Sequence, residues 1–293
     1  MLSNSAKKYL NKYGVAPGKN LVFFTNNDSA YETAIDFFEQ GIKVEAIVDT
    51  RDGSDGYYPK KANKLGITIL KGYEISDTVG RLKIREVKLR KIKTENNNEK
   101  SSINIKCDLL AIAGGWTPTV HLFTQSKGKL KFRDVDGSFI PSEVYQDTLC
   151  VGSCNGDYNL NEILLKTQKD TSTYLKDNQN ELGEVNYKSD NLNNGNHENV
   201  WITSKNNIAR TKMFVDFQND VTAKDIKLAL KEGFQSIEHV KRYTTTGMAT
   251  DQGKTSNVNA LGIISELTNT EISELGTTTF RLPYKPVTFG AIA

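Results

Sequence analysis

Residues 19–49 decide the fold class, and they read KNLVFFTNNDSAYETAIDFFEQGIKVEAIVD. The apolar run Leu21–Phe24 is followed by a polar turn, Asn26–Ser29, and then by apolar residues at helical spacing. Gly41 stands where helices commonly end, and a second apolar run closes on Asp49. Strand, helix and strand in this order form a βαβ unit, which predicts a parallel sheet.

The flanking sequence continues this α/β pattern. Gly66–Leu70 predicts a further short strand, and Gly80–Ile92 alternates apolar with basic residues, as antiparallel hairpins do. The polar stretch that follows, from Lys93 to Ser102, predicts a loop. Cys107–Ala113 and Thr148–Gly152 predict two buried strands, each ending in a turn that contains glycine.

The last third of the chain is helical in pattern. Asn178–Glu198 is rich in Asn, Asp, Glu, Lys and Gly, which indicates a linker or solvated loop. Thr222 and Asp225 form a capping-box pattern at the start of a helix that ends at Gly233. A second helix is expected over Asn257–Leu267.

The composition is that of an ordinary soluble protein. Hydrophobic residues make up 37% and charged residues 25% of the 293 residues, and no apolar run approaches the roughly 20 residues that cross a bilayer. The net charge is +3, with 38 basic and 35 acidic residues interleaved, so neither a nucleic acid nor a membrane is expected as a partner. With three cysteines and no secretory signal, the cytoplasm is the expected compartment.

The turn Thr25–Ala30 stands where a dinucleotide-binding βαβ unit would carry its glycine-rich loop, yet it contains no glycine. Close approach of a pyrophosphate is therefore not expected there. Asp49 follows the second strand, where an acidic residue would accept hydrogen bonds from a ribose, but a structural role at the strand end is the favoured interpretation.

Two glycine-bearing turns offer better cofactor contacts. Gly114 and Gly115 follow one predicted strand, and Gly156 and Asp157 follow the other. Small residues at strand ends allow a cofactor to approach, and an Asp after such a turn can accept hydroxyl groups of a ribose or ribitol. A helix expected from about Asn159 would add its N-terminus. The alternative is a pair of ordinary tight turns.

The segment Lys241–Ser256 gathers cations, hydroxyl groups and a helix start, which together favour a phosphate site. It is not a P-loop, because five residues separate Gly247 from Gly253 where that motif has four, and no apolar strand precedes them. A polar helix cap on a solvated loop is the alternative. The candidate contacts are Lys241, Arg242, Thr250, Gln252, Lys254, Thr255 and Ser256.

Neither a metal site nor a catalytic pair is predicted. The three histidines, His121, His197 and His239, are scattered, and the cysteines lie on predicted strands or their turns, where small core residues are common. No nucleophile stands beside a base. The sequence therefore predicts neither metal ligands nor catalytic residues.

Four strings resemble the alpha subunit of heterotetrameric sarcosine oxidase: VFFTNNDSAY (22–31), AGGWTP (113–118), FVDFQNDVT (214–222) and GMATDQGKTSN (247–257). The resemblance extends over nearly the whole chain. It implies a subunit that binds NAD, contacts a beta partner that oxidises sarcosine on FAD, and shares an FMN with that partner at their interface. The alpha segment that matches the FMN contact is Lys241–Ser256.

The resemblance implies an internal piece of that subunit. No glycine-rich fingerprint precedes Lys7, and the sequence stops at Ala293, where a folate-binding, aminomethyltransferase-like domain would begin. Dinucleotide binding is consequently expected to be weak or absent. Phe214–Leu267 also resembles a small helical domain that holds an iron–sulfur cluster in related dehydrogenases, but it contains no cysteine.

We therefore expect an α/β protein with a partial two-dinucleotide-binding-domain oxidoreductase fold, parallel sheets and a small helical module. The expected parts are a partial FAD/NAD(P)-binding-like domain (1–190) with an inserted second βαβ subdomain (20–105), a linker (191–212), a helical flavin-contacting module (213–268) and a connector (269–293). The expected function is to hold cofactor in a complex that demethylates sarcosine to glycine, the isolated chain being inactive. An NAD(P)H-dependent flavin oxidoreductase and a non-catalytic assembly scaffold are the alternatives.

Overall fold

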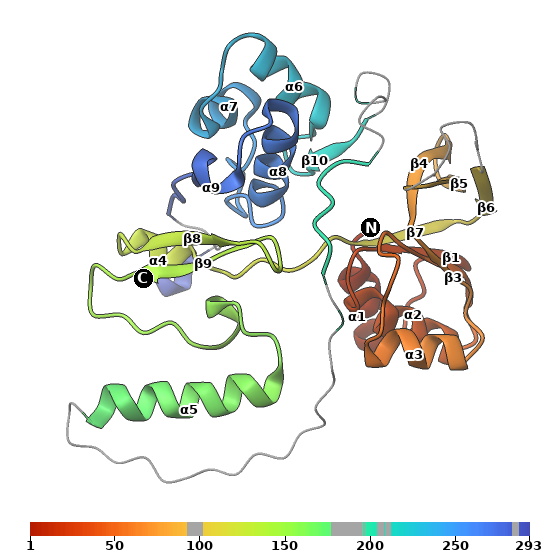
Figure 1. Cartoon of the computed structure of the whole chain (residues 1–293), viewed down its shortest axis with the longest axis horizontal. Helices are drawn as coiled ribbons and strands as arrows, with labels where there is room; N and C mark the ends of the chain where they lie inside the picture. The colour runs from red at the N-terminus through yellow and green to blue at the C-terminus, as the bar shows by residue number, and fades with distance from the viewer. Residues whose placement is uncertain (93–101, 177–194, 196, 204–207, 209–211, 283–286) are drawn as a thin grey trace. The chain divides into compact units, whose positions relative to one another are not determined.

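A computed structural model describes residues 1–92, 102–176, 195, 197–203, 208, 212–282 and 287–293 (Figure 1). The chain forms two compact units. Unit 1 comprises residues 1–115 and 192–204, and unit 2 comprises residues 116–191 and 205–293. This division differs from the expected one, because residues 116–176 group with the C-terminal helices and 192–204 group with the N-terminal sheet. Most of the predicted linker, 178–198, and the predicted loop at 93–101 lie outside the described residues.

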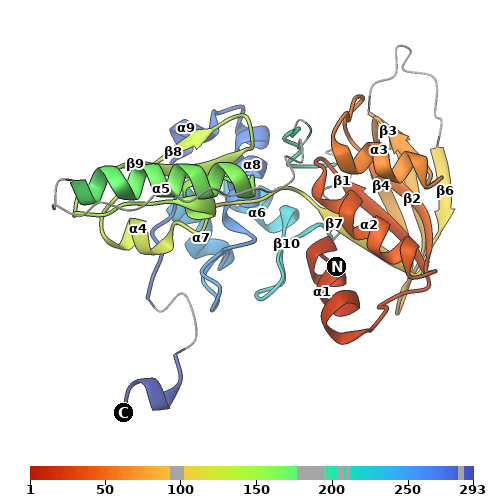
Figure 2. The same ribbon diagram turned by 90° about the horizontal axis from the view of Figure 1, so that it is seen from below.

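A four-stranded parallel sheet forms the centre of unit 1, in the order β3-β2-β1-β7. Its strands are β1 (Asn20–Thr25), β2 (Lys43–Asp49), β3 (Ile69–Lys71) and β7 (Leu109–Ala113). Helix α2 (Ser29–Glu39) connects β1 to β2, so the predicted βαβ unit is confirmed. Helices α1 (Ser3–Tyr13) and α3 (Tyr57–Lys64) complete the helical layer (Figure 2).

The two faces of this sheet are covered differently. Leu21 and Phe23 point to one face and pack with α2 residues such as Phe37. Their neighbour Val22 points to the other face and packs with Val87 of a second sheet. This alternation follows from the two-residue period of a strand, and burial of both faces explains why the run Leu21–Phe24 is apolar throughout.

The second sheet of unit 1 is antiparallel, in the order β4-β5-β6. It contains β4 (Tyr73–Gly80), β5 (Ile84–Lys91) and β6 (Ser102–Lys106). The antiparallel pairing expected from the alternation of Gly80–Ile92 is confirmed, although the strand β4 begins before that segment.

Unit 2 begins with α4 (His121–Gln125) and the antiparallel pair β8 (Lys129–Arg133) and β9 (Ser138–Glu143). The predicted strand at Thr148–Gly152 is wrong. Leu149 is 43% exposed, and from Gly152 the chain forms the 3-10 helix η1 (Gly152–Asn155). An apolar run becomes a buried strand only beside a partner strand, and the structure gives this run none. Helix α5 (Leu160–Lys176) follows, close to its predicted start.

The C-terminal part of unit 2 is a small helical module, as expected. A short pair, β10 (Phe214–Asp216) and β11 (Val221–Thr222), leads into α6 (Ala223–Lys231). Asp225 accepts hydrogen bonds from the backbone N and Oγ1 of Thr222, so the predicted capping box is present. Three more helices follow, α7 (Ile237–Thr244), α8 (Asn257–Thr268) and α9 (Ile272–Leu275), and η3 (Phe289–Ala291) lies near the C-terminus.

The core of the module lies between α6, α7 and α8. Ile226, Val240, Leu261 and Ile264 are buried there. Across the part of the chain that the structure describes, no helix has the length and apolar character needed to span a membrane. The α/β fold class with its parallel sheet and helical module is confirmed.

Candidate functional site

The turn between β1 and α2 is filled by the chain's own charged groups. Asp49 is fully buried and accepts hydrogen bonds from the Tyr31 hydroxyl at 2.6 Å and from Arg51 Nη2 and Nε at 2.7 and 2.9 Å. Burial and then the Asp49 charge raise the pKa of Tyr31. The Asp49 carboxylate is thus committed to internal donors, which supports the structural role over the ribose role.

Asp28 completes this buried network. Its Oδ1 lies 2.8 Å from Arg51 Nη2, and its Oδ2 accepts the backbone N–H of Gly195 at 2.8 Å. A Cβ on Gly56 would lie 1.7 Å from the same oxygen, so the carboxylate packs directly against the backbone. Burial opposes ionisation of Arg51, but hydrogen bonds and charges from Asp49 and Asp28 outweigh it and raise its pKa.

The start of α2 is also capped from within. Asn27 Oδ1 accepts hydrogen bonds from the backbone N of Ser29 at 2.9 Å and from its hydroxyl at 2.6 Å. Asn26 Nδ2 donates to the carbonyls of Gly114 and Glu198. In a dinucleotide-binding βαβ unit a pyrophosphate lies at this helix start, whereas here the side chains of Asn26 and Asp28 bond to Glu198 and Gly195 beside it.

Gly114 and Gly115 lie in unit 1, at the carboxyl end of β7. Gly115 has a φ of +113°, and a Cβ on it would lie 2.6 Å from Cε1 of His197. Both the backbone conformation and the close approach therefore require glycine. The neighbour that approaches in this structure is His197.

Gly156 and Asp157 lie in unit 2, after η1. Arg133 Nη2 donates to the Gly156 carbonyl at 2.7 Å, and a Cβ on Gly156 would lie 2.5 Å from the same nitrogen. Both Asp157 oxygens accept from Lys166 Nζ, at 3.0 and 2.8 Å. The turn is thus tied to β8 and to α5.

The Lys241–Ser256 segment folds around a buried carboxylate, that of Asp216 at the end of β10. Its Oδ2 accepts the backbone N–H of Gly247 at 2.7 Å and the Ser256 hydroxyl at 3.4 Å. Its Oδ1 accepts from the backbone N–H groups of Gln218 and Asn219 at 2.9 and 3.2 Å. Asp216, which is 2% exposed, therefore accepts hydrogen bonds from the segment that the sequence suggested as a phosphate site.

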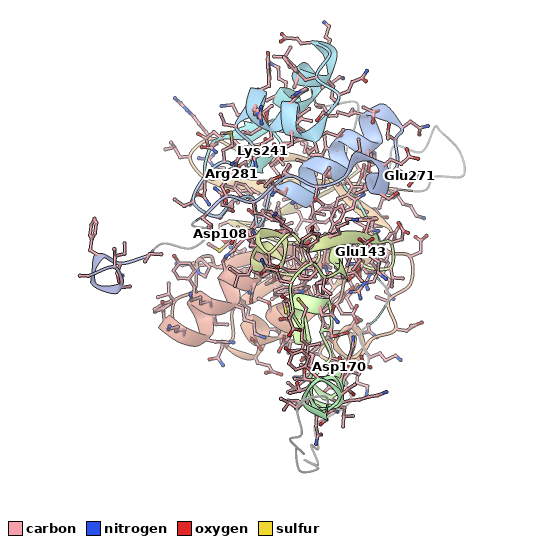
Figure 3. All side chains as sticks on the ribbon, turned by 90° about the vertical axis from the view of Figure 1, so that its left-hand side faces the viewer. Asp108, Glu143, Asp170, Lys241, Glu271 and Arg281 are labelled. Carbon is pink, nitrogen blue, oxygen red and sulfur yellow. The ribbon has the colours of Figure 1, made fainter. Side chains whose placement is uncertain are left out.

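Residues of the Lys241–Ser256 segment also line a pocket of about 110 Å³. Three cations line it, Lys241 and Arg242 from α7 and Arg281 from the segment after α9, together with Glu238, Met248 and Gln252. Figure 3 labels two of these cations, Lys241 and Arg281. A single carboxylate among three cations leaves a net positive charge.

Local hydrogen bonds hold the pocket in shape. Gln252 Oε1 accepts the backbone N–H of Arg281 at 2.9 Å, and Glu238 accepts that of Thr279 at 2.8 Å. Lys241 is 7% exposed and donates to the Thr279 carbonyl at 3.1 Å. Burial, with Arg281 and Arg242 nearby, lowers the pKa of Lys241 against an opposing effect of Glu238. A bound anion would favour the protonated amine, because it would offset the two arginine charges.

The structure separates the other predicted contacts from this pocket. Thr250 donates to Gln218, and Thr255 is exposed. Ser256 is buried against Asp216. Lys254 lines a different, mainly apolar hollow with His121, whose pKa is lowered by burial and by Lys254. Three predicted residues are thus brought together, Lys241, Arg242 and Gln252.

Arg281 is the pocket residue that sequence reasoning missed. It lies far along the chain from α7, in a segment read only as a connector. The charge pattern around Lys241 gave no sign of it. Within the described residues no three His, Cys, Asp or Glu side chains lie close enough to hold a metal ion. The pocket is suited to an anion such as a phosphate group.

Comparison with known proteins finds relatives of both parts of the chain. Residues 210–293 match the family model of the sarcosine oxidase A3 domain. All 293 residues align with sarcosine oxidase subunit alpha of Rhizobium meliloti (strain 1021) at 34% identity and of Corynebacterium sp. (strain U-96) at 32% identity. The chain is homologous over its whole length to the sarcosine oxidase alpha subunit.

This alpha-subunit homologue spans 28% and 31% of those two relatives. Among solved structures, the L-proline dehydrogenase of P. horikoshii matches 100% of the chain with a TM-score of 0.67 at 18% identity, and 54% of that protein is covered. At this identity the likeness shows the fold alone. The suspected resemblance is confirmed.

Proposed function

We propose that this chain is the cofactor-holding segment of an alpha-type subunit in a complex that oxidatively demethylates sarcosine to glycine. The observation that carries the proposal is the pocket formed by Lys241, Arg242 and Arg281. In this proposal the pocket binds the phosphate group of FMN at the interface with a beta subunit. The homology to sarcosine oxidase alpha subunits supports the same assignment.

The dimensions and donors of the pocket support a phosphate. Two guanidinium groups and an ammonium group provide charge-assisted hydrogen bonds, which are the strong ones in proteins. Water is displaced most fully where a second subunit covers the site, and charges interact more strongly there. The flavin ring and its chemistry are assigned to the interface, and this chain is assigned the binding of the phosphate.

For NAD we propose weak binding or none by this chain. The position that a pyrophosphate would take at the α2 start lies beside the Asp28 carboxylate, so the phosphate charge would meet a buried negative group. Asp49 has its oxygens committed to Arg51 and Tyr31. An independent NAD(P)H-dependent flavin oxidoreductase is disfavoured for the same reason.

An assembly scaffold is the second candidate function. It is favoured by Asp216, which accepts bonds from Gly247 and Ser256 and so stabilises the loop without any cofactor. On either proposal catalysis is assigned to another subunit, and the isolated chain is inactive.

The test is to co-express the chain with a sarcosine oxidase beta subunit and to measure bound FMN and FAD. Arg242→Ala and Arg281→Ala should each lower FMN retention by roughly 10-fold or more, because each removes a charge-assisted bond, while FAD is retained. Lys254→Ala is the matched control, since Lys254 lies on the same segment but does not line this pocket.

Unchanged FMN in both arginine variants would contradict the cofactor proposal and leave the scaffold. An equal loss in the Lys254 variant would show that the phosphate lies elsewhere on the Lys241–Ser256 segment. Thermal unfolding of each variant, measured in parallel, identifies any loss that comes from misfolding.

A further inference from the structure

Two of the three cysteines of the chain lie together in the segment between β9 and α5. The sequence placed Cys150 on a buried strand, where a thiol would be a small core residue. Because that strand does not form, Cys150 is half-buried, and so is Cys154 in η1. Cys107, by contrast, is 4% exposed in the core of unit 1. All three are free thiols in this structure.

The thiols of Cys150 and Cys154 contact each other. A side-chain hydrogen bond joins them, and Cys154 Sγ also donates to the Val151 carbonyl at 3.0 Å. Only three residues separate the two cysteines along the chain. Two sulfur atoms in contact can come within bonding distance through a change of side-chain torsion, so the fold does not have to rearrange for a disulfide to form.

Backbone and side-chain hydrogen bonds hold the turn that presents this pair. The Gly156 N–H donates to the Ser153 carbonyl at 3.2 Å, and the Asp157 N–H donates to the Gly152 carbonyl at 3.3 Å. Arg133 of β8 donates to the Gly156 carbonyl at 2.7 Å. Because the turn is already ordered, closing a disulfide ring here loses less chain entropy than closing the same ring in an unfolded chain.

We propose that Cys150 and Cys154 form a reversible dithiol–disulfide site that is oxidised by small-molecule disulfides such as oxidised glutathione. First, one cysteine thiolate attacks the glutathione disulfide, forms a mixed disulfide and releases one glutathione. The other cysteine then loses its proton and attacks the protein-bound sulfur, which expels the second glutathione. Two protein thiols and one glutathione disulfide thus give one protein disulfide and two glutathione thiols. This inference goes beyond the proposed flavin site and does not depend on it.

Oxidation has a local structural consequence. The disulfide closes a ring of residues 150–154, which includes most of η1. Gly156 and Asp157 follow directly, and their backbone N–H groups bond back into this ring. Hydrogen exchange of these two amides requires the turn to open, so exchange should be slower in the oxidised chain. Because the pair is partly exposed, thiols can reach the disulfide and reduce it again.

The experiment equilibrates the full, folded chain with mixtures of reduced and oxidised glutathione, alkylates the remaining thiols and digests the chain with trypsin. Residues 134–166 form one tryptic peptide with both Cys150 and Cys154, whereas Cys107 lies on the separate peptide 107–127. Cys150→Ser and Cys154→Ser are the matched variants, each with one thiol of the pair. The wild-type chain unfolded in guanidinium chloride provides the reference for the same two cysteines without the folded turn.

In the folded wild type we expect peptide 134–166 to lose two hydrogen atoms and to escape alkylation, while Cys107 remains a thiol. Each serine variant should instead carry one glutathione on its remaining cysteine of the pair. Relative to glutathione, the disulfide should be favoured by roughly 10-fold or more in the folded chain compared with the unfolded one. Dithiothreitol should restore both thiols, and circular dichroism should show that the variants remain folded.

Three results would each overturn the proposal. The folded wild type could accumulate glutathione adducts on peptide 134–166 instead of the internal disulfide, or it could form disulfide-linked dimers. The disulfide could also be no more favourable in the folded chain than in the unfolded one, which would mean that the turn does not position the pair. Flavin plays no part in these measurements, so this proposal and the flavin proposal fail separately.

Discussion

At the scale of single residues, Arg51 is the cation that pairs with the buried carboxylates beside the β1–α2 turn. Its guanidinium is 3% exposed and lies between two buried carboxylates, those of Asp28 and Asp49. A buried ion pair adds little net stability in general, but removing one partner leaves an uncompensated buried charge. Here the removal of one cation would leave two carboxylates close together.

We predict that Arg51→Met lowers the free energy of unfolding by about 3–5 kcal/mol. Tyr31→Phe, which removes one hydrogen bond to Asp49, should cost only about 1–3 kcal/mol. Urea unfolding followed by circular dichroism measures both. Arg85→Met, on an exposed position, is the control and should stay within about 0.5 kcal/mol of wild type. A loss at Arg51 no larger than at Arg85 would refute the network as a source of stability.

At the scale of elements, hydrogen bonds join the pair β10–β11 to the Lys241–Ser256 segment. Asp216 joins them, because it accepts bonds from Gly247, Ser256, Gln218 and Asn219. Residues 214–222 and 247–257 are thus joined through one side chain. The capping box of α6, by contrast, acts only within residues 222–225.

We expect Asp216→Ala to destabilise the chain by about 2–4 kcal/mol, because two buried donors and two partly buried ones lose their acceptor at once. Asp225→Ala removes a helix cap and should cost only about 1 kcal/mol. Thermal unfolding of the two variants, followed at 222 nm, tests the difference. Equal losses would mean that Asp216 acts as an ordinary local cap.

Local sequence patterns predicted most helices and strands. The predictions failed where the structure depends on residues far away along the chain. The β1–α2–β2 unit, the antiparallel hairpin and the capped helix α6 were predictable because their signals lie within 10 to 30 neighbouring residues. The apolar run Thr148–Gly152 looked like a strand, but strand formation depends on a partner that the run itself does not encode. Arg281 joins Lys241 only through the packing of α9 and the chain after it.

At the scale of the whole molecule, the two units carry different candidate roles. Unit 1 has a parallel sheet whose strand ends are bonded to the chain's own side chains. Unit 2 holds the cationic pocket. The homology extends across both units.

For the intact chain we predict no measurable heat on titration with NAD at up to millimolar concentration, because a pyrophosphate at the α2 start would lie against the Asp28 carboxylate. Isothermal titration calorimetry with ADP-ribose as a second ligand provides the check. Micromolar binding of either ligand would show that Gly195, Glu198 and Asp28 give way to a nucleotide.

The internal carboxylate at Asp28 also changes how the chain responds to its surroundings. A domain whose helix start is completed by a dissociable nucleotide gains stability only in proportion to the logarithm of ligand concentration. The Asp28 carboxylate, by contrast, is part of the chain, so one such anion is present whenever the chain folds. Unit 1 should therefore keep the same melting temperature in nucleotide-free and nucleotide-rich solution.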